Sequence, residues 1–178
     1  MIFELTVITL SLVFLLILFK LNSKAFQRFG LAFVAVLLFE YFTQALWLNL
    51  NLEPWSYLYL DVSWILTIGW ATIIVVSLEL IELYFPNYSE KVRYFLSIFI
   101  IGIVGFFAEW AVIALGIRDY PLAVKQGLSG ILLGYGKVPI EALYYIPVFM
   151  ALMVAFVRYW EMLLSQKPKK TKKRGKKK

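Results

Sequence analysis

Three glutamates lie within long apolar stretches of this sequence: Glu40, Glu109 and Glu141. An ionisable side chain at membrane depth costs about 2.5 to 3.5 kcal/mol on insertion scales, so such a residue is expected to have a partner and a function. Desolvation and neighbouring negative charges both favour the protonated form of a carboxyl group. We therefore expect at least one of the three acids to stay protonated near neutral pH and to transfer its proton to an apolar substrate.

Aromatic and amide side chains accompany these glutamates at helical spacing. Gln44 and Trp47 follow Glu40 at i+4 and i+7 and so share its helix face. The negative faces of aromatic rings can stabilise the cation that forms when a double bond is protonated. We predict Glu40, Glu109 and Glu141 as catalytic residues. The predicted substrate-binding residues are Gln44, Trp47, Trp110, Tyr144 and Tyr145.

Each of these acids also has a structural interpretation, and the sequence alone leaves both open. Glu40 and Glu109 can join helices through interhelical hydrogen bonds, and Glu141 can favour the first turn of its helix by complementing the macrodipole. Gly102 and Gly105 share a helix face with Glu109, and small residues there allow a second helix to come close. That face is therefore expected to point into the protein.

Three further acids are expected to be structural. Glu79 and Glu82, near the inner end of the third apolar stretch, are predicted to be solvated partners of Lys91 and Arg93. Asp61 is predicted to be the N-cap of the helix that follows it. None of these three acids is expected at the site.

The composition indicates a membrane protein. Of the 178 residues, 62% are hydrophobic and only 16% are charged, which is far too apolar for an ordinary soluble domain. The sequence has no Cys and no His, which excludes thiolate catalysis, disulfides, iron–sulfur clusters and histidine-based metal sites. Any catalysis must use carboxylates, tyrosines, lysines or water, and we expect no metal and no cofactor.

Five stretches reach the roughly 20 apolar residues that a membrane-spanning helix needs. They cover about residues 2–20, 26–50, 60–84, 92–117 and 138–164. The first has neither a basic segment before it nor a small-residue cleavage site, so we expect a retained helix and not a signal peptide. The sequence thus predicts an all-α polytopic membrane protein with one helical domain over residues 1–166. The longest connection is expected to hold a short interfacial or re-entrant helix at residues 122–133.

The second to fifth stretches can be aligned as an internal repeat. Glu40 falls on Glu109 at an offset of 69 residues. At the same offset, Ala45 falls on Ala114. Each unit would hold two spans that start from the same side of the membrane, which gives a parallel repeat of spans 2–3 and 4–5 about an axis along the membrane normal.

Basic residues fix the predicted orientation, because cytoplasmic connections are rich in Lys and Arg. The second connection has none. The first and third connections and the end of the last span carry Lys20, Lys24, Arg28, Lys91, Arg93 and Arg158. The amino terminus is therefore expected outside and the carboxyl terminus in the cytoplasm, in a multi-pass protein of the cell membrane.

The end of the chain is a basic tail. Residues 167–178 hold nine of the eighteen Lys and Arg, so the rest of the chain carries nine basic against eleven acidic residues. Closely spaced like charges repel and cannot bury a core, so the tail is predicted to be disordered and to adsorb to anionic lipid headgroups. Nucleic acid is the less favoured partner for the same composition.

The segment VPIEALYYIPVFMALMVAFVR resembles the P-x-E-x-x-(F/Y)-(F/Y) segment of the membrane-embedded lycopene cyclase domain. That domain occurs in heterodimeric bacterial, archaeal and fungal carotenoid cyclases, and the related carotenoid hydratases are more loosely similar. Pro139, Glu141, Tyr144 and Tyr145 carry the resemblance, whereas Ala142 stands where the family usually has a second acid. The resemblance implies a cofactor-independent cyclisation in which the other two buried glutamates take part.

We therefore expect an intramembrane acid–base enzyme that acts on a long apolar polyene or isoprenoid lipid. Glu141 or Glu109 would protonate a terminal double bond, and Glu40 would remove a proton afterwards. A non-catalytic membrane subunit or lipid-binding protein is the first alternative, and a small proton-coupled transporter is the second. Five spans are fewer than a complete two-domain cyclase carries, which leaves room for a homodimer or a second membrane subunit.

Overall fold

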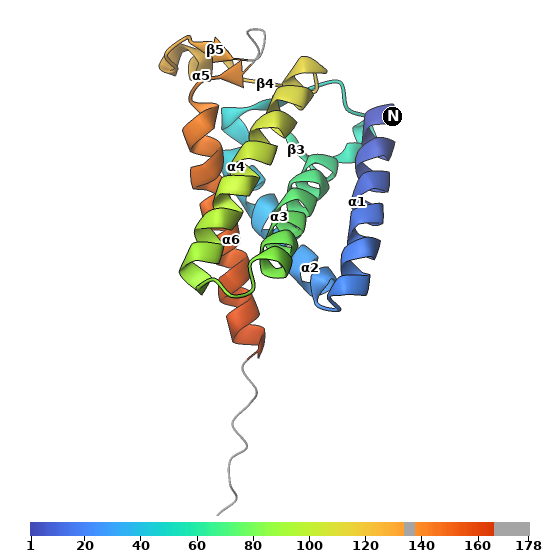
Figure 1. The fold of residues 1–178 in the computed structure, drawn as a ribbon. Coiled ribbons are helices and arrows are strands. Elements are labelled where there is room, and N and C mark those ends of the chain that lie inside the picture. The colour runs from blue at the N-terminus through green and yellow to red at the C-terminus, as the bar shows by residue number, and fades with distance from the viewer. Residues whose placement is uncertain (134–137, 166–178) are drawn as a thin grey trace, which may run out of the picture.

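The computed structural model describes residues 1–133 and 138–165, and most of these residues are helical (Figure 1). Five of the helices are long and apolar enough to span a membrane, as the sequence predicts. They are α1 (Ile2–Leu21), α2 (Ala25–Thr43), α3 (Trp64–Tyr84), α4 (Glu90–Ala114) and α6 (Ala142–Ser165). A sixth, short helix is α5 (Leu122–Gly127), which accounts for the first part of the helix predicted at 122–133. The predicted basic tail at 167–178 lies outside the described residues.

Four of the long helices, α2, α3, α4 and α6, pack around one core, and α1 packs on the outside of α3 (Figure 1). α3 buries side chains around most of its circumference. The outward faces of the other helices keep large apolar side chains exposed, such as Phe14, Phe99 and Leu152. Exposed apolar surface on this scale is unusual for a soluble monomer and is what lipid-facing helices carry.

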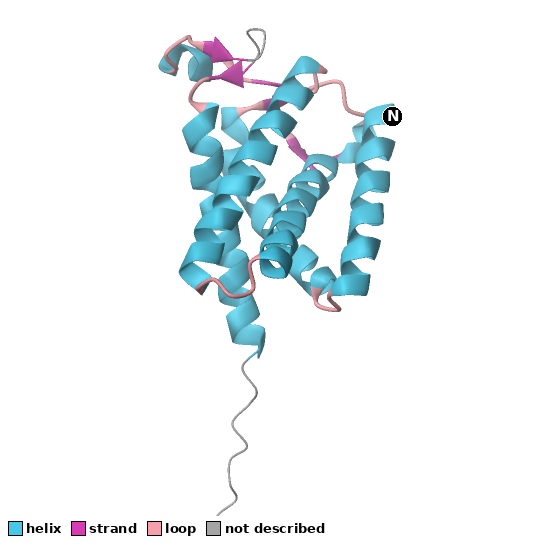
Figure 2. Cartoon of the chain, viewed as in Figure 1, coloured by secondary structure: helices cyan, strands magenta, loops and turns pink. Residues whose placement is uncertain are grey.

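Six short strands, which the sequence did not predict, lie among the described residues of this mostly helical chain. The strands form three antiparallel pairs: β1 (Leu48–Asn49) with β4 (Arg118–Asp119), β2 (Tyr57–Tyr59) with β3 (Val62–Ser63), and β5 (Leu132–Leu133) with β6 (Val138–Pro139). All three lie at one end of the helix bundle (Figure 2). Extended connections must satisfy their backbone hydrogen-bonding groups, and pairing with one another does so.

The strands also explain why several predicted helix ends are displaced. The second apolar stretch was predicted to run to residue 50, but α2 ends at Thr43 and a 3₁₀ turn, Gln44–Leu46, leads into β1. Asp61 is not the N-cap of α3, because Ser63 holds that position. The Asp61 carboxylate instead accepts a hydrogen bond from the backbone N–H of Asn49 at 3.0 Å. Apolarity alone does not separate a helical turn from a short buried strand.

An ion network joins the helices at the end opposite to the strands. The buried guanidinium of Arg28 on α2 contacts Glu79 at 2.8 Å and Glu82 at 3.0 Å, both on α3. It also contacts Glu161 on α6 at 2.6 Å. Arg158 pairs with Glu82 and Glu161 as well. The prediction that Glu79 and Glu82 pair with Lys91 and Arg93 is therefore wrong, since a buried guanidinium requires these carboxylates.

Candidate functional site

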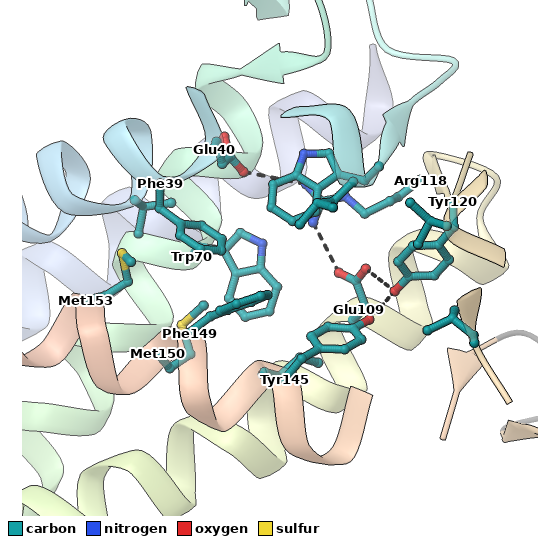
Figure 3. A pocket seen from close by; sticks show the side chains of 16 residues that line it. Phe39, Glu40, Trp70, Glu109, Arg118, Tyr120, Tyr145, Phe149, Met150 and Met153 are labelled. Carbon is teal, nitrogen blue, oxygen red and sulfur yellow. Dashed lines mark hydrogen bonds and ion pairs between the residues drawn. The ribbon is translucent and has the colours of Figure 1, made fainter. Parts of the chain in front are cut away.

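An apolar cavity of about 130 Å³ lies between α2, α3, α4 and α6, beneath the strands (Figure 3). Aromatic and aliphatic side chains form most of its wall, and charged side chains gather at one end. Its lining residues are Val36, Phe39, Glu40, Leu46, Trp47, Trp70, Glu109, Arg118, Tyr120, Val124, Leu128, Tyr145, Ile146, Phe149, Met150 and Met153.

Arg118, on β4, is the central charged residue of this cavity. Its Nη1 lies 3.2 Å from Glu109 Oε2, and its Nη2 lies 3.5 Å from Glu40 Oε1. Its Nε donates to Asn49 Oδ1 at 3.0 Å, and the guanidinium lies 5.1 Å from the centre of the Trp47 ring. Burial opposes the charge, but the nearby charge of Glu109 above all outweighs it and raises the pKa of Arg118. The guanidinium therefore stays charged and links α2 to α4.

Two tyrosines continue the network from Glu109. The hydroxyl of Tyr120 donates to Glu109 Oε1 at 2.8 Å, and the hydroxyls of Tyr120 and Tyr145 are hydrogen-bonded to each other (Figure 3). Burial, and then the nearby charge of Glu109, raise the pKa of Tyr120, so its phenol remains a neutral donor. Each hydroxyl has one hydrogen, so Tyr145 donates to Tyr120 when Tyr120 donates to Glu109. Glu109 thus accepts from both of its hydrogen-bond partners, Arg118 and Tyr120.

Glu40 has a different environment. Its side chain is 2% exposed, and its Oε2 lies 2.7 Å from the hydroxyl of Thr67. That hydroxyl also lies 3.0 Å from the carbonyl oxygen of Ser63 one turn earlier. Its Oε1 contacts Arg118 at 3.5 Å but makes no hydrogen bond with the residues that the structure describes. This oxygen is therefore held by the ion pair with Arg118 and not by a hydrogen bond.

The structure brings four of the predicted site residues to the cavity and leaves four away from it. Glu40, Trp47, Glu109 and Tyr145 line it. Gln44, Trp110, Glu141 and Tyr144 are not among its lining residues. Tyr144 is 63% exposed on the outer face of α6, because successive residues of a helix point about 100° apart and Tyr145 takes the inward position.

Glu141 holds a loop and does not face the cavity. Its Oε1 accepts a hydrogen bond from the backbone N–H of Ser129 at 2.6 Å. The preceding residue Leu128, at the end of α5, is part of the cavity wall. The hydrogen bond from Ser129 lowers the pKa of Glu141. Glu141 therefore fixes the segment that closes one side of the cavity.

The ionised carboxylate of Glu141 accepts this hydrogen bond more strongly than the protonated form does. Its contribution to stability should therefore be present above the pKa that Glu141 has in the unfolded chain, and should be lost as pH falls through the lower pKa that it has in the folded protein. We expect the backbone N–H of Ser129 to become less protected against hydrogen exchange in acid, and Glu141→Gln to remove this pH dependence. Exchange measured by mass spectrometry across an acidic pH series would check it. Glu90→Gln, an exposed acid at the start of α4, is the control. An unchanged acid response in Glu141→Gln would contradict the assignment.

The sequence analysis did not predict seven residues of the site. Three are polar, Arg118, Tyr120 and Thr67, and four are aromatic or sulfur-containing, Phe39, Trp70, Phe149 and Met153. Arg118 directly follows the predicted fourth span (92–117), and a single arginine at the end of an apolar stretch does not by itself indicate a site. The repeat could have indicated Arg118. It stands 69 residues after Asn49, and Glu109 stands 69 residues after Glu40.

The chemistry available at this site is proton transfer. Two carboxyl groups, one guanidinium and two phenols meet at the end of a cavity that is otherwise apolar. Among residues 1–133 and 138–165, no group of three or more acidic side chains is arranged to hold a metal ion. The site therefore offers acid–base groups of the chain itself and aromatic faces that stabilise positive charge.

Comparison with known proteins identifies no relative: no family model, no curated protein and no solved structure matches the chain.

Proposed function

We propose that this protein is an intramembrane acid–base enzyme that acts on the terminal double bond of a long apolar polyene or isoprenoid, as a lycopene cyclase does. One observation carries the proposal. Glu40 and Glu109, on different helices, meet through Arg118 at the charged end of an apolar, aromatic-lined cavity. A cavity of about 130 Å³ is similar in size to a cavity of roughly 150 Å³ that binds benzene, so it takes the end group of a long molecule and not the whole of it.

The placement of the chain in the membrane is part of the proposal. The five apolar helices would span the bilayer with the strands at the outer surface and the ion network of Arg28 at the cytoplasmic side. The register of β1 and β4 supports a parallel repeat, because Asn49 pairs with Arg118, its equivalent at the offset of 69 residues. Equivalent residues meet in this way at a twofold axis.

Charge balance assigns the proton of the site to one of the two glutamates. A single guanidinium can neutralise only one carboxylate, and an unpaired buried charge is strongly unfavourable. Glu109 accepts from Arg118 and Tyr120, so it is the ionised acid. The Thr67 hydroxyl has one hydrogen for two acceptors, Glu40 Oε2 and the Ser63 carbonyl, and when it donates to Ser63 a protonated Oε2 of Glu40 can donate to Thr67. Glu40 is then the protonated acid, and the site as a whole is neutral.

With Glu40 protonated and Glu109 ionised, Glu40 would be the acid and Glu109 the base, which is the reverse of what the sequence predicts for these two residues. The O–H bond at Oε2 of Glu40 would leave its hydrogen bond with Thr67 and break as the proton passes to the terminal double bond, which forms a C–H bond and leaves a tertiary carbocation, with the Glu40 carboxylate beside Arg118. The π electrons of a double bond further along the chain would attack this cation and close a ring. The carboxylate of Glu109 would then remove a proton from carbon, restoring a double bond without any cofactor. The rings of Trp70, Phe39 and Phe149 line the space in which the cation would form.

Expression in a bacterial host that accumulates lycopene tests this function directly. Conversion of lycopene to a cyclised carotenoid, detected by chromatography and absorption spectra, is the expected result. A hydroxylated acyclic product would show that water captures the cation, which is still acid–base chemistry at the same bond. Unchanged lycopene in cells that contain the folded protein would remove lycopene as the substrate.

One observation favours proton-coupled transport as a second candidate. A more polar cavity of about 560 Å³ at the strand end of the bundle shares Arg118, Tyr120 and Leu128 with the inner cavity. Protons from that side could therefore reach the buried acids through Tyr120. Proton flux in liposomes that depends on a second solute would support transport, and its absence would leave the enzyme as the better proposal.

The proposed orientation predicts the result of a labelling experiment. The chain has no cysteine, so Ile2→Cys and Gly175→Cys each introduce a single thiol. We expect an impermeant thiol reagent added to intact cells to label position 2 and not position 175, because the basic connections favour the cytoplasm. Permeabilised cells, in which both positions should react, are the control. Labelling of position 175 from outside would reverse the topology.

A further inference from the structure

A second apolar cavity forms a groove between α1, α3 and α4, with a volume of about 300 Å³. On α1 its wall runs from Phe3 to Phe14, a length of roughly 16 Å at the helical rise of 1.5 Å per residue. Small residues, Gly69 on α3 and Ala108 and Ala111 on α4, leave this space open. The groove is therefore long and narrow.

The chemistry of the groove suits a hydrocarbon chain without a polar head. None of the described residues that line it is charged. Its hydroxyl groups are those of Ser11 and Thr72, and the Thr72 hydroxyl already donates to the carbonyl of Ile68 at 2.8 Å. A phospholipid headgroup would lose its hydrogen bonds here, at an energetic cost. An elongated hydrocarbon would lose nothing.

Trp70 lies in the wall of both this groove and the inner cavity. The indole packs against Gly105 on α4, where an added Cβ would lie 2.9 Å from a ring carbon. A larger residue at 105 would displace the ring, so the glycine allows the indole to fill the gap between α3 and α4. The groove and the inner cavity are thus neighbours that meet at Trp70.

We propose that the groove holds the hydrocarbon chain of an elongated apolar molecule whose end group enters the inner cavity past a displaced Trp70. The inference rests on the proposed function, because that function requires a long molecule and the inner cavity accommodates only its end. The groove adjoins the cavity, has matching apolarity and is elongated along α1. The extended hydrocarbon chain of the substrate would then lie between α1, α3 and α4.

Binding of a long and a short probe to the purified full chain tests this arrangement. The long probe is lycopene, measured by absorbance as pigment retained per protein after gel filtration in detergent. The short probe is myrcene, a ten-carbon hydrocarbon with the same dimethyl-substituted terminal double bond, measured by the rise that it causes in Tm. Ala111→Phe fills the groove from an exposed position on α4 and should not disturb the core. Val104→Phe, on the lipid-facing side of the same helix at 42% exposure, is the matched control.

In Ala111→Phe we expect retained lycopene to fall at least about fivefold, because a bulky group in a fitted apolar site discriminates by this much or more. The shift caused by myrcene should not change, and Val104→Phe should match the wild type with both probes. Normal lycopene retention in Ala111→Phe would overturn the inference. It would mean that something else, such as detergent, lipid or a second copy of the chain, fills the groove. Loss of both probes would overturn the division between groove and cavity.

The two proposals fail in different ways. If the wild type forms no product but Ala111→Phe still loses only lycopene, the binding inference stands and the catalytic function falls. If product forms and lycopene retention is the same in Ala111→Phe and the wild type, the function stands and the groove is not part of its site. A wild type that retains neither probe would overturn the inference together with its premise.

Discussion

Replacing Glu40 by glutamine is expected to reduce product formation by about 10²- to 10⁴-fold while leaving the fold and its stability nearly unchanged. A glutamine amide has the shape and neutral charge of a protonated glutamate. Its NH₂ group can donate to Thr67, and its oxygen can face Arg118, as the acid does at 2.7 Å and 3.5 Å. The substitution therefore removes the proton to be transferred and keeps the contacts.

Glu109→Gln should behave differently in the same measurements. It removes an ionised partner from the buried guanidinium of Arg118, so it should lower stability as well as activity, by about 3 to 5 kcal/mol if no other group compensates. Product yield and Tm in detergent, measured side by side on the two variants, separate the two acids. Glu90→Gln, which is exposed, should change neither quantity.

Any of three results would contradict the assignment. Full activity in Glu40→Gln would show that this residue is not the acid. A lower Tm in Glu40→Gln together with an unchanged Tm in Glu109→Gln would place the proton on Glu109 instead, as the sequence first suggested. Equal and large losses of Tm in both variants would indicate that both acids are ionised, which conflicts with a neutral site.

Arg28→Leu is expected to destabilise the protein by about 3 to 5 kcal/mol, because it leaves three carboxylates around a site that has lost its buried guanidinium. Glu79 is buried with Arg28, and among residues 1–133 and 138–165 Glu82 and Glu161 would keep Arg158 as their remaining ion-pair partner. Three helices meet at this residue, so α2 should separate first from α3 and α6. Unfolding in a denaturing detergent, followed by circular dichroism, measures the effect.

Lys24→Leu is the matched control for that experiment. Lys24 is an exposed cation near the start of α2, and removing it should change stability by less than about 0.5 kcal/mol. The double variant Arg28→Leu with Glu79→Leu should recover part of the loss, since replacing both members of a buried pair by apolar residues is often neutral. A single variant as stable as the wild type would show that the network contributes no net stability.

The sequence alone was sufficient for the five long helices, because each depends on a local run of apolar residues whose length matches a membrane. The same local reasoning identified Glu40 and Glu109, since an acid within such a run must be buried or paired. The offset of 69 residues also indicated that these two acids are equivalent, and both contact Arg118. The buried, interior face predicted for Glu109 is the one on which it lies.

Only the tertiary structure decided which residues meet. Arg118 and Tyr120 come from a connection, and they reach Glu109 because β4 pairs with β1 and turns the chain back over the bundle. Glu141 was predicted from its position in a motif, but its contact with Ser129 depends on how the loop folds, which no local pattern contains. Glu79 and Glu82 contact Arg28, which is more than 50 positions away in the sequence. They do not pair with Lys91 and Arg93, which are nearer in the sequence. Apolar periodicity specifies that a helix exists, whereas its rotation about its own axis, and hence the partner of each charged side chain, is set by packing against the other helices.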